Sequence, residues 1–232
     1  MNLTLQTIPS PLLSELLASS YLDGVVLDTE HGHFNNETLY NCIQVITLHN
    51  KKCLVRFTDL NKQLVRMCLD AGVDGVIFST VEDCKSSAKI LEYCHYPSHG
   101  GRRGCGLVRE NRWGEKPLGN NKPLVIAQIE TKKAVDNIEN ITKHEFDAFI
   151  IGPYDLSASL GCTADWSNEL YLEYINKIRS SIPTHKLGSF LPTQRDIENF
   201  RKIDEAHSAI LILGMDTDFI KQGINNINKK IW

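Results

Sequence analysis

The feature of this sequence that most limits its possible folds is a regular alternation of short apolar runs with longer amphipathic segments. Several of the short runs are apolar at consecutive positions, which is typical of parallel strands buried on both faces. Eight runs predict strands: Leu3–Ile8, Gly24–Glu30, Cys53–Phe57, Gly75–Thr80, Leu124–Glu130, Ala148–Pro153, Lys186–Phe190 and Ala209–Gly214.

Segments of helical length separate these runs. Ser10 followed by Pro11 is typical of a helix N-cap with proline at the first helical position. Apolar spacing or flanking residues predict further helices at Glu37–Leu48, Leu60–Ala71, Leu170–Ile182, Arg195–Ile203 and Asp218–Ile227. Dividing 232 residues among eight strand–helix units gives 29 residues each, which suits a (β/α)8 barrel. An open doubly wound sheet is the alternative, but no Gly-x-Gly-x-x-Gly follows the first strand.

The composition narrows the class of protein. Hydrophobic residues make up 42% and charged residues 23% of the chain, so a core can form and intrinsic disorder is excluded. A net charge of −3 gives no electrostatic case for a nucleic-acid partner. No apolar run approaches the roughly 20 residues that cross a bilayer, and Met1–Ser10 lacks the features of a signal peptide. The seven cysteines form no C-x-x-C pair. We therefore expect one α/β domain over residues 1–232, cytoplasmic, with no membrane partner.

Polar side chains collect where the predicted strands end. In a barrel these strand ends meet at one face, where active sites form. Burying several charges there is costly unless they pair or bind a metal, so their convergence predicts an active site. The residues concerned are Asp28, Glu30, His31, Arg56, Gln128, Glu130, Tyr154 and Asp155.

Glu130 and Asp155 end consecutive predicted strands, which places two carboxylates side by side. Carboxylate oxygens with room for water and substrate suit a hard divalent ion such as Mg²⁺ or Mn²⁺. The alternative is that each carboxylate caps the helix that follows it, a contribution of about 1 kcal/mol.

His31 and His33 form an H-x-H pair, which at a strand end can bind zinc. A zinc site of that type needs further histidines at later strand ends, but His144, His185 and His207 precede strands or lie in predicted helices. One catalytic histidine, His31, is therefore favoured, because imidazole titrates near neutral pH and can move protons. The alternative is a loop histidine that only bonds its neighbours.

Lysine-dependent chemistry is disfavoured, since no lysine lies inside a predicted strand, where burial would depress its pKa. The glycine-rich stretch Gly100–Gly106 carries Arg102 and Arg103, which suit an anionic substrate. A surface loop explains this stretch equally well.

Three motifs together carry a family resemblance: D-x-E-H-G, Q-x-E-T and G-P-x-D-L-S-x-S-L-G. With them, nearly the whole chain resembles the HpcH/HpaI family of metal-dependent pyruvate aldolases. The matching segments are Leu27–Gly32, Val55–Arg56, Leu69–Gly75, Arg103–Arg109, Gln128–Thr131, Phe149–Gly161 and Ile212–Thr217.

The resemblance implies a (β/α)8 barrel of the pyruvate-binding type, assembled as a homohexamer or trimer, with the last helix exchanged between neighbours. It implies that Glu130 and Asp155 bind Mg²⁺, Mn²⁺ or Co²⁺, and that His31, oriented by Asp70, transfers a proton. Arg56 would contact the pyruvyl oxygens. The remaining substrate-binding positions implied are Gln128, Gly152, Pro153, Tyr154, Asp155, Leu156, Ser157 and Arg103.

The activity implied is reversible cleavage of a 4-hydroxy-2-oxo acid into pyruvate and an aldehyde, through a metal-stabilised enolate. An acyl-thioester lyase with a similar barrel, and a non-catalytic barrel that binds a keto acid, are the alternatives. The chain departs from the family pattern at His33, where proline is common. It departs again at Tyr96–Gly101, one residue longer than usual, where we take Arg103 rather than Arg102 as the matching arginine.

Overall fold

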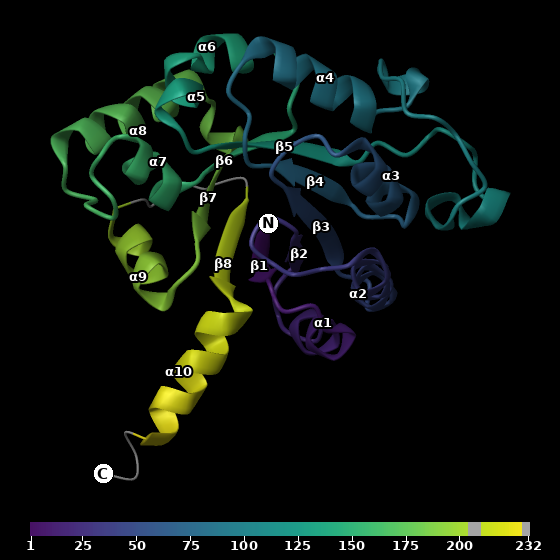
Figure 1. Cartoon of the computed structure of the whole chain (residues 1–232), viewed down its shortest axis with the longest axis horizontal. Helices are drawn as coiled ribbons and strands as arrows, with labels where there is room; N and C mark the ends of the chain where they lie inside the picture. The colour runs from purple at the N-terminus through teal and green to yellow at the C-terminus, as the bar shows by residue number, and fades with distance from the viewer. Residues whose placement is uncertain (204–209, 229–232) are drawn as a thin grey trace.

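The computed structural model describes residues 1–203 and 210–228, and in these residues the strands form a closed, all-parallel barrel (Figure 1). Each strand pairs with the next along the chain, and β8 pairs back with β1. The predicted (β/α)8 barrel is therefore confirmed. Its strands are β1 (Asn2–Gln6), β2 (Gly24–Asp28), β3 (Lys52–Phe57), β4 (Gly75–Phe78), β5 (Leu124–Ile129), β6 (Ala148–Ile151), β7 (Leu187–Leu191) and β8 (Leu211–Met215).

The helices alternate with the strands. They are α1 (Pro11–Ala18), α2 (Asn36–Leu48), α3 (Lys62–Asp70), α4 (Cys84–Cys94), α5 (Lys132–Asp136), α6 (Ile138–Ile141), α7 (Pro153–Ser159), α8 (Glu169–Ser181), α9 (Gln194–Ile203) and α10 (Asp216–Asn228), with 3-10 turns η1 (Pro97–His99), η2 (Arg109–Gly114) and η3 (Thr184–Lys186). Ser10 accepts a hydrogen bond from the N–H of Leu13, as expected of the predicted N-cap. Helix α4 was not predicted. Its buried face consists of Ser87, Ile90 and Cys94. Because a serine and a cysteine occupy two of these positions, the helical spacing of apolar residues is not evident in the sequence.

Four strands, β1, β2, β4 and β6, end two residues before their predicted limits. Strand β2 stops at Asp28, because the Asp28 carboxylate accepts the N–H of Glu30 at 3.1 Å and turns the chain. Strand β6 stops at Ile151, and Pro153 already begins α7. Glu30 and His31 therefore belong to a loop rather than to the sheet. The predicted start of the last strand, Ala209, lies outside the described residues, as does His207.

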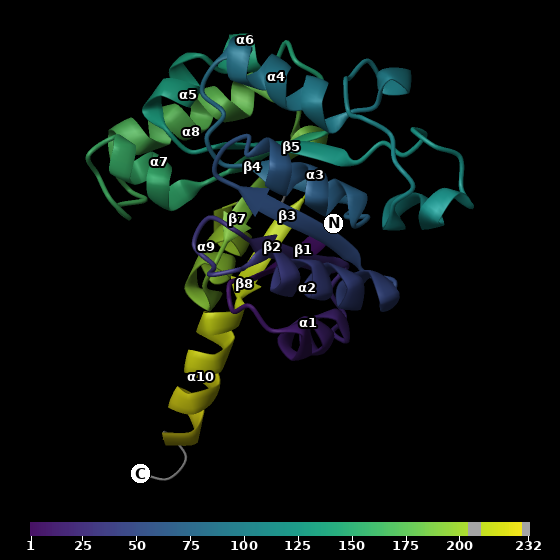
Figure 2. The same ribbon diagram turned by 45° about the vertical axis from the view of Figure 1, so that its right-hand side comes forward.

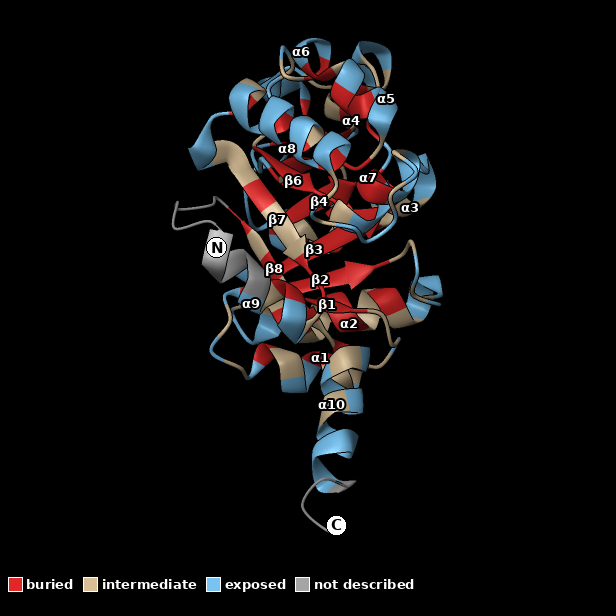
Figure 3. Cartoon of the chain, turned by 90° about the vertical axis from the view of Figure 1, so that its left-hand side faces the viewer, coloured by how far each residue is buried: buried red, intermediate tan, exposed pale blue. Residues whose placement is uncertain are grey.

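Strands β2 to β6 are buried on both faces, whereas β7 and β8 are only partly buried (Figure 3). One apolar cluster fills the space between the strands and the surrounding helices. A second cluster fills the barrel interior: Leu3, Leu5, Val26, Leu54, Ile77, Ile126, Ala148, Ile150, Ile210 and Ile212. A packed interior supports the residues at the mouth from below. In the part of the chain that is described, none of the helices has the length and apolar character that crossing a bilayer requires.

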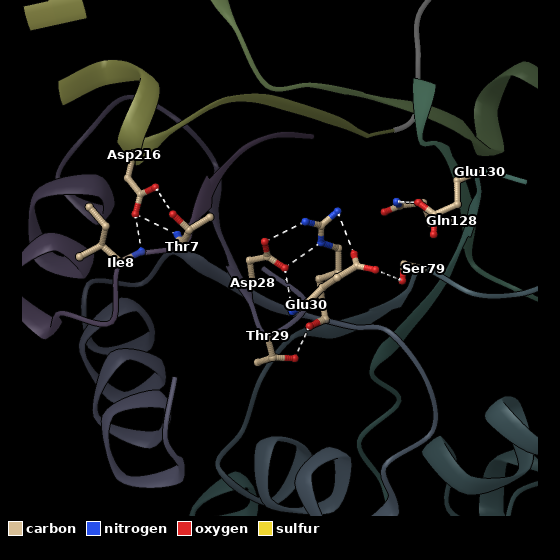
Figure 4. A network of polar contacts seen from close by, with 10 residues as sticks. Thr7, Ile8, Asp28, Thr29, Glu30, Ser79, Gln128, Glu130 and Asp216 are labelled. Carbon is tan, nitrogen blue, oxygen red and sulfur yellow. Dashed lines mark hydrogen bonds and ion pairs between the residues drawn. The ribbon is translucent and has the colours of Figure 1, made fainter. Parts of the chain in front are cut away.

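Helix α10 projects away from the barrel instead of lying along it (Figures 1 and 2). The buried Asp216 fixes its first turn, accepting the N–H groups of Thr7 and Ile8 at 2.8 and 2.7 Å and the Thr7 hydroxyl at 2.8 Å. Gly214 precedes this turn with φ +70°, and a Cβ there would lie 2.4 Å from the Phe219 ring. The junction between β8 and α10 is thus fastened to the end of β1 (Figure 4).

Candidate active site

A cavity of about 370 Å³ opens at the mouth of the barrel, where the strands end at their carboxyl termini. It brings together many of the residues that the sequence singled out, from four separate segments of the chain. Its lining consists of Leu5, Asp28, His31, Arg56, Gln128, Gly152, Pro153, Tyr154, Asp155, Phe190, Pro192, Thr193 and Met215.

Arg56 is the structural centre of the polar part of this cavity. Asp28 and Arg56 face each other in the register of β2 and β3, and the guanidinium donates from Nε and Nη2 to the two Asp28 oxygens at 2.9 and 2.8 Å. Arg56 is 3% exposed. Burial opposes its charge, but the Asp28 hydrogen bonds and the nearby carboxylates outweigh burial and raise the pKa of Arg56. The side chain is therefore held rigidly and fully charged.

Glu30 approaches the same guanidinium from the other side (Figure 4). Its Oε2 lies 3.3 Å from Arg56 Nη1, and its Oε1 accepts the Ser79 hydroxyl at 2.7 Å. Two carboxylates thus flank one guanidinium, which leaves this group of side chains with a net negative charge.

Glu130 is buried close to this group, and 6% of the residue is exposed. The Gln128 side-chain amide donates a hydrogen bond to Glu130 Oε2. Burial, with the charges of Glu30 and Asp155, raises the pKa of Glu130 to about 8 despite the Gln128 hydrogen bond and the Arg56 charge. The Glu130 carboxylate thus lies in an environment that favours either a proton or a cation.

Gly152 allows this packing. A Cβ at position 152 would lie 2.7 Å from Glu130 Cβ and 2.8 Å from its Oε2, so no other residue fits without displacing the carboxylate. Gly152 has no side chain to cap α7, and the amides of Tyr154 and Asp155, in its first turn, have no partner within the helix. These amides lie beside the cavity that both residues line.

The donor atoms here fit a hard divalent cation. Glu130 and Asp155 supply carboxylate oxygens, and the buried Oε1 of Gln128 has no hydrogen-bond partner. Over residues 1–203 and 210–228, no three His, Cys, Asp or Glu side chains form a group that could hold a metal. Protein ligands alone would thus leave coordination positions for water or substrate. The exposed His31 lines the cavity, whereas His33 is not among the lining residues.

The structure does not bring Asp70 to His31. Asp70 ends α3, which runs back from the barrel mouth, so Asp70 lies at the opposite end of the barrel. There its Oδ1 accepts Arg103 Nη2 at 2.9 Å, and its Oδ2 lies 3.6 Å from Arg66 Nε. Arg103 is buried and stacks 4.3 Å from the centre of the Tyr96 ring. Within one chain, neither Asp70 nor Arg103 reaches the cavity.

Leu156 and Ser157 also lie away from the cavity. Both are buried, and Leu156 belongs to the cluster between strands and helices. The Ser157 hydroxyl donates to the Tyr154 carbonyl at 2.7 Å and accepts the Ala164 N–H at 3.0 Å. These two residues shape the turn after Gly152 and offer no free donor to a ligand.

Sequence reasoning missed the apolar part of the lining, Leu5, Phe190 and Met215, and the serine that holds Glu30, Ser79. Leu3 and Leu5 both lie in the barrel-interior cluster, against which Phe190 and Met215 pack. Alternation along β1 could therefore have identified Leu5 as an inward-facing position at the mouth.

Fold and site together define a (β/α)8-barrel protein whose mouth carries the buried Glu130, the exposed Asp155, an arginine between carboxylates and an exposed histidine. The sequence model of the HpcH/HpaI aldolase/citrate lyase family matches residues 8–221. The chain belongs to this family, as its motifs predicted.

Individual relatives agree with this assignment. The 2-keto-3-deoxy-L-rhamnonate aldolase of Escherichia coli (strain K12) is 30% identical over 155 residues, 64% of this chain. The match spans 58% of that enzyme's length. Among solved structures, the citrate synthase SbnG is 26% identical with a TM-score of 0.83, over 99% of this chain and 91% of SbnG. An HpcH/HpaI aldolase/citrate lyase family protein from Burkholderia cenocepacia J2315 shares the fold, with a TM-score of 0.87 at 20% identity over 100% and 94% of the two chains.

Proposed function

We propose that this protein is a divalent-metal-dependent aldolase that reversibly cleaves a 4-hydroxy-2-oxo acid into pyruvate and an aldehyde. The observation that carries the proposal is the buried Glu130, which lies near Asp155 and Arg56 and whose pKa is raised to about 8. Membership of the family and the aldolase relative support it.

Glu130 and Asp155 would hold Mg²⁺, Mn²⁺ or Co²⁺, with the Gln128 amide orienting Glu130. When bound, the cation supplies Lewis-acid polarisation of the keto group of the substrate. The amides of Tyr154 and Asp155 would receive the substrate carboxylate, a role that the absence of a side-chain cap on the first turn of α7 supports.

Arg56 would stabilise the negative charge that develops on the keto oxygen. An arginine has five N–H donors. Asp28 takes two of them, from Nε and Nη2, and Glu30 lies 3.3 Å from Nη1 as an ion pair. The donors that remain lie on the two Nη atoms at the end of the guanidinium. A guanidinium fixed in this way needs no reorganisation when the charge appears, which makes such a donor effective.

His31 would move the proton. In cleavage, its imidazole accepts the proton of the 4-hydroxyl group while the C3–C4 bond breaks, and the bonding electrons pass to the keto oxygen of the resulting enolate. The same histidine can return a proton to C3, which gives pyruvate. Asp70 could orient His31 only from a second copy of the chain, because the two residues lie at opposite ends of one barrel.

The experiment that tests this function measures pyruvate release from 4-hydroxy-2-oxo acids with Mg²⁺, Mn²⁺ or Co²⁺, and deuterium exchange into the pyruvate methyl group. We expect both activities to disappear with a chelator, in Glu130→Gln, and in His31→Gln. His33→Gln is the matched control, since His33 lies two residues away but outside the cavity lining, and it should keep both. Absence of exchange in the wild type with every metal would refute the proposal.

A thioester lyase is the weaker alternative. A coenzyme A handle needs cationic groups beside the site, and Arg56 is the one lysine or arginine among the residues lining this cavity. A thermal shift with coenzyme A but none with pyruvate would favour the alternative.

We further propose a cytoplasmic homo-oligomer in which α10 packs on a neighbouring copy. All seven cysteines are free, which suits a reducing compartment. Ile220, Ile224 and Ile227 follow helical spacing on α10 and are 47, 55 and 60% exposed. Leu12 and Leu16 of α1 are similarly exposed. Apolar stripes of this kind mark protein interfaces.

A further inference from the structure

The mouth of the barrel is divided into a polar arc and an apolar arc. Strands β2 to β6 are consecutive neighbours, and they or the turns after them carry the polar residues Asp28, Arg56, Ser79, Gln128 and Asp155. Strands β7, β8 and β1 are also consecutive, because the barrel closes between β8 and β1.

The second arc lines the cavity with apolar side chains. Phe190 of β7, Met215 of β8 and Leu5 of β1 all line it, followed by Pro192 and Thr193 after β7. Phe190 also packs its ring 5.2 Å from the Arg56 guanidinium carbon. The apolar arc, defined as Leu5, Phe190 and Met215, therefore borders the polar arc directly at the arginine.

The two carboxylates next to the apolar arc, those of Asp216 and Asp196, already have hydrogen-bond donors. Asp216 is buried and accepts four hydrogen bonds, from the backbone and hydroxyl of Thr7 and the backbone of Ile8 and Thr217. Asp196, behind Thr193, accepts the hydroxyls of Thr193 and Tyr154 at 2.6 and 3.2 Å. Neither carboxylate is free to recognise a substrate.

The electrostatics of the cavity also disfavour a second anionic group. Arg56 is paired with both Asp28 and Glu30, and among the described residues no lysine or other arginine lines the cavity. The carboxylates of Asp28 and Glu30 already outnumber the Arg56 guanidinium. A carboxylate or phosphate at the far end of a substrate would thus be desolvated against apolar side chains, near an excess of like charge.

On this basis, and resting on the proposed aldolase function, we propose that the apolar arc is the aldehyde subsite and takes an uncharged aldehyde with an apolar chain. The oxygens of the keto acid are drawn to the polar arc, so its methyl carbon faces the apolar arc. In the synthetic direction, His31, which lines the same cavity, takes a proton from that methyl carbon. The resulting enolate carbon bonds to the aldehyde carbon, the electrons of the aldehyde C=O π bond pass to its oxygen, and that oxygen takes the proton back from His31. The aldehyde chain then lies against Leu5, Phe190 and Met215.

A matched pair of aldehydes tests the proposal. Butanal and succinic semialdehyde have the same four-carbon chain and differ in ending with a methyl group or a carboxylate. With pyruvate and Mn²⁺, we expect kcat/KM for butanal to exceed that for succinic semialdehyde by at least about tenfold. An equal rate, or a preference for the anionic aldehyde, overturns the proposal.

Variants at Met215 test where the aldehyde chain lies. Met215→Lys places a cation in the apolar arc, and Met215→Leu changes its shape without charge. We expect the ratio of succinic semialdehyde to butanal activity to rise at least about tenfold in the lysine variant relative to the leucine variant. An unchanged ratio in a folded Met215→Lys protein contradicts this placement.

Deuterium exchange into pyruvate separates this proposal from the proposed function, because the exchange needs no aldehyde. Wild-type exchange together with a preference for succinic semialdehyde would overturn the aldehyde subsite alone. Wild-type protein that does not exchange would overturn the aldolase function itself. If Met215→Lys does not fold, the wild-type comparison of the two aldehydes still decides the proposal.

Discussion

At the scale of single residues, two buried ionisable side chains of the site, Arg56 and Glu130, differ in how their charges are compensated. Arg56 is buried but has two carboxylate partners, so it stays charged. Glu130 is buried and accepts a hydrogen bond from the neutral Gln128 amide, and other carboxylates lie near it. The charge of Arg56 is thus compensated within the chain, whereas that of Glu130 is compensated by a proton or a cation from outside.

The raised pKa of Glu130 predicts how stability depends on pH in metal-free protein. Below about pH 4.5 the carboxyl is protonated in both states. Between about 4.5 and 8 the unfolded state loses this proton while the folded state retains it, so the free energy of unfolding falls as pH rises. The loss is several kcal/mol, at most about 5. Urea unfolding with a chelator at pH 5, 6.5 and 8 measures it. Glu130→Gln should be less dependent on pH, and parallel pH profiles for the two proteins would contradict the prediction.

The substitution Arg56→Lys tests the pairing of the Arg56 guanidinium with Asp28 and Glu30. Lysine keeps the charge but cannot donate to both Asp28 oxygens and Glu30 in one geometry. We expect a loss of about 2–3 kcal/mol in stability and a decrease of about 10²–10³ in kcat, measured by urea unfolding and pyruvate exchange. Arg102→Lys is the control, because Arg102 pairs with Glu92 on the surface, and it should change stability by less than about 1 kcal/mol.

At the scale of elements, the turn after β6 decides whether Glu130 can occupy its position. Gly152→Ala places a Cβ 2.7 Å from Glu130 Cβ, so the carboxylate must move. We expect a loss of about 1–3 kcal/mol in stability and about 10–100-fold weaker Mn²⁺ binding, measured by calorimetry.

Gly223→Ala in α10 is the control for this substitution, since a Cβ at position 223 meets no atom within 4 Å. Alanine favours a helix by up to about 1 kcal/mol over glycine. Stability should therefore be unchanged or higher, with Mn²⁺ binding unaltered. Equal loss of Mn²⁺ binding in both variants would show that the contact with Glu130 is not the cause.

The sequence predicted some of these features better than others, because residue types differ in how clearly they indicate a buried strand, a strand end or a site. The eight strands were predicted because runs such as Cys53–Phe57 are apolar on both faces. Their ends were less accurate, since local turns such as that between Asp28 and Glu30 stop a strand before its polar residues. The polar side of the site was predicted because charges at strand ends are unusual. The apolar side was not, because Leu5 and Met215 resemble any other core residue, and the place of Asp70 depends on the direction of α3.

At the scale of the whole molecule, the projecting α10 predicts association between copies. Ile220→Glu combined with Ile224→Lys removes the apolar stripe without altering the Asp216 contacts at its base. We expect sedimentation velocity to show a smaller assembly than the wild type forms. Asn226→Lys, on another face of α10, should leave the assembly intact. A wild-type protein that sediments as a monomer at micromolar concentration would exclude the proposed assembly.

The seam between β1 and β8 joins the first strand of the barrel to its last. During synthesis the chain leaves the ribosome amino terminus first, so β1 pairs with β8 only after all the other strands of the barrel have been made. Until then Leu3 and Leu5 lack Ile210 and Ile212 of their cluster, and Asp216 has not yet reached the amides of Thr7 and Ile8. Closure of the barrel, and with it the complete mouth, is therefore among the last events of folding, and nascent chains arrested before β8 should be sensitive to protease.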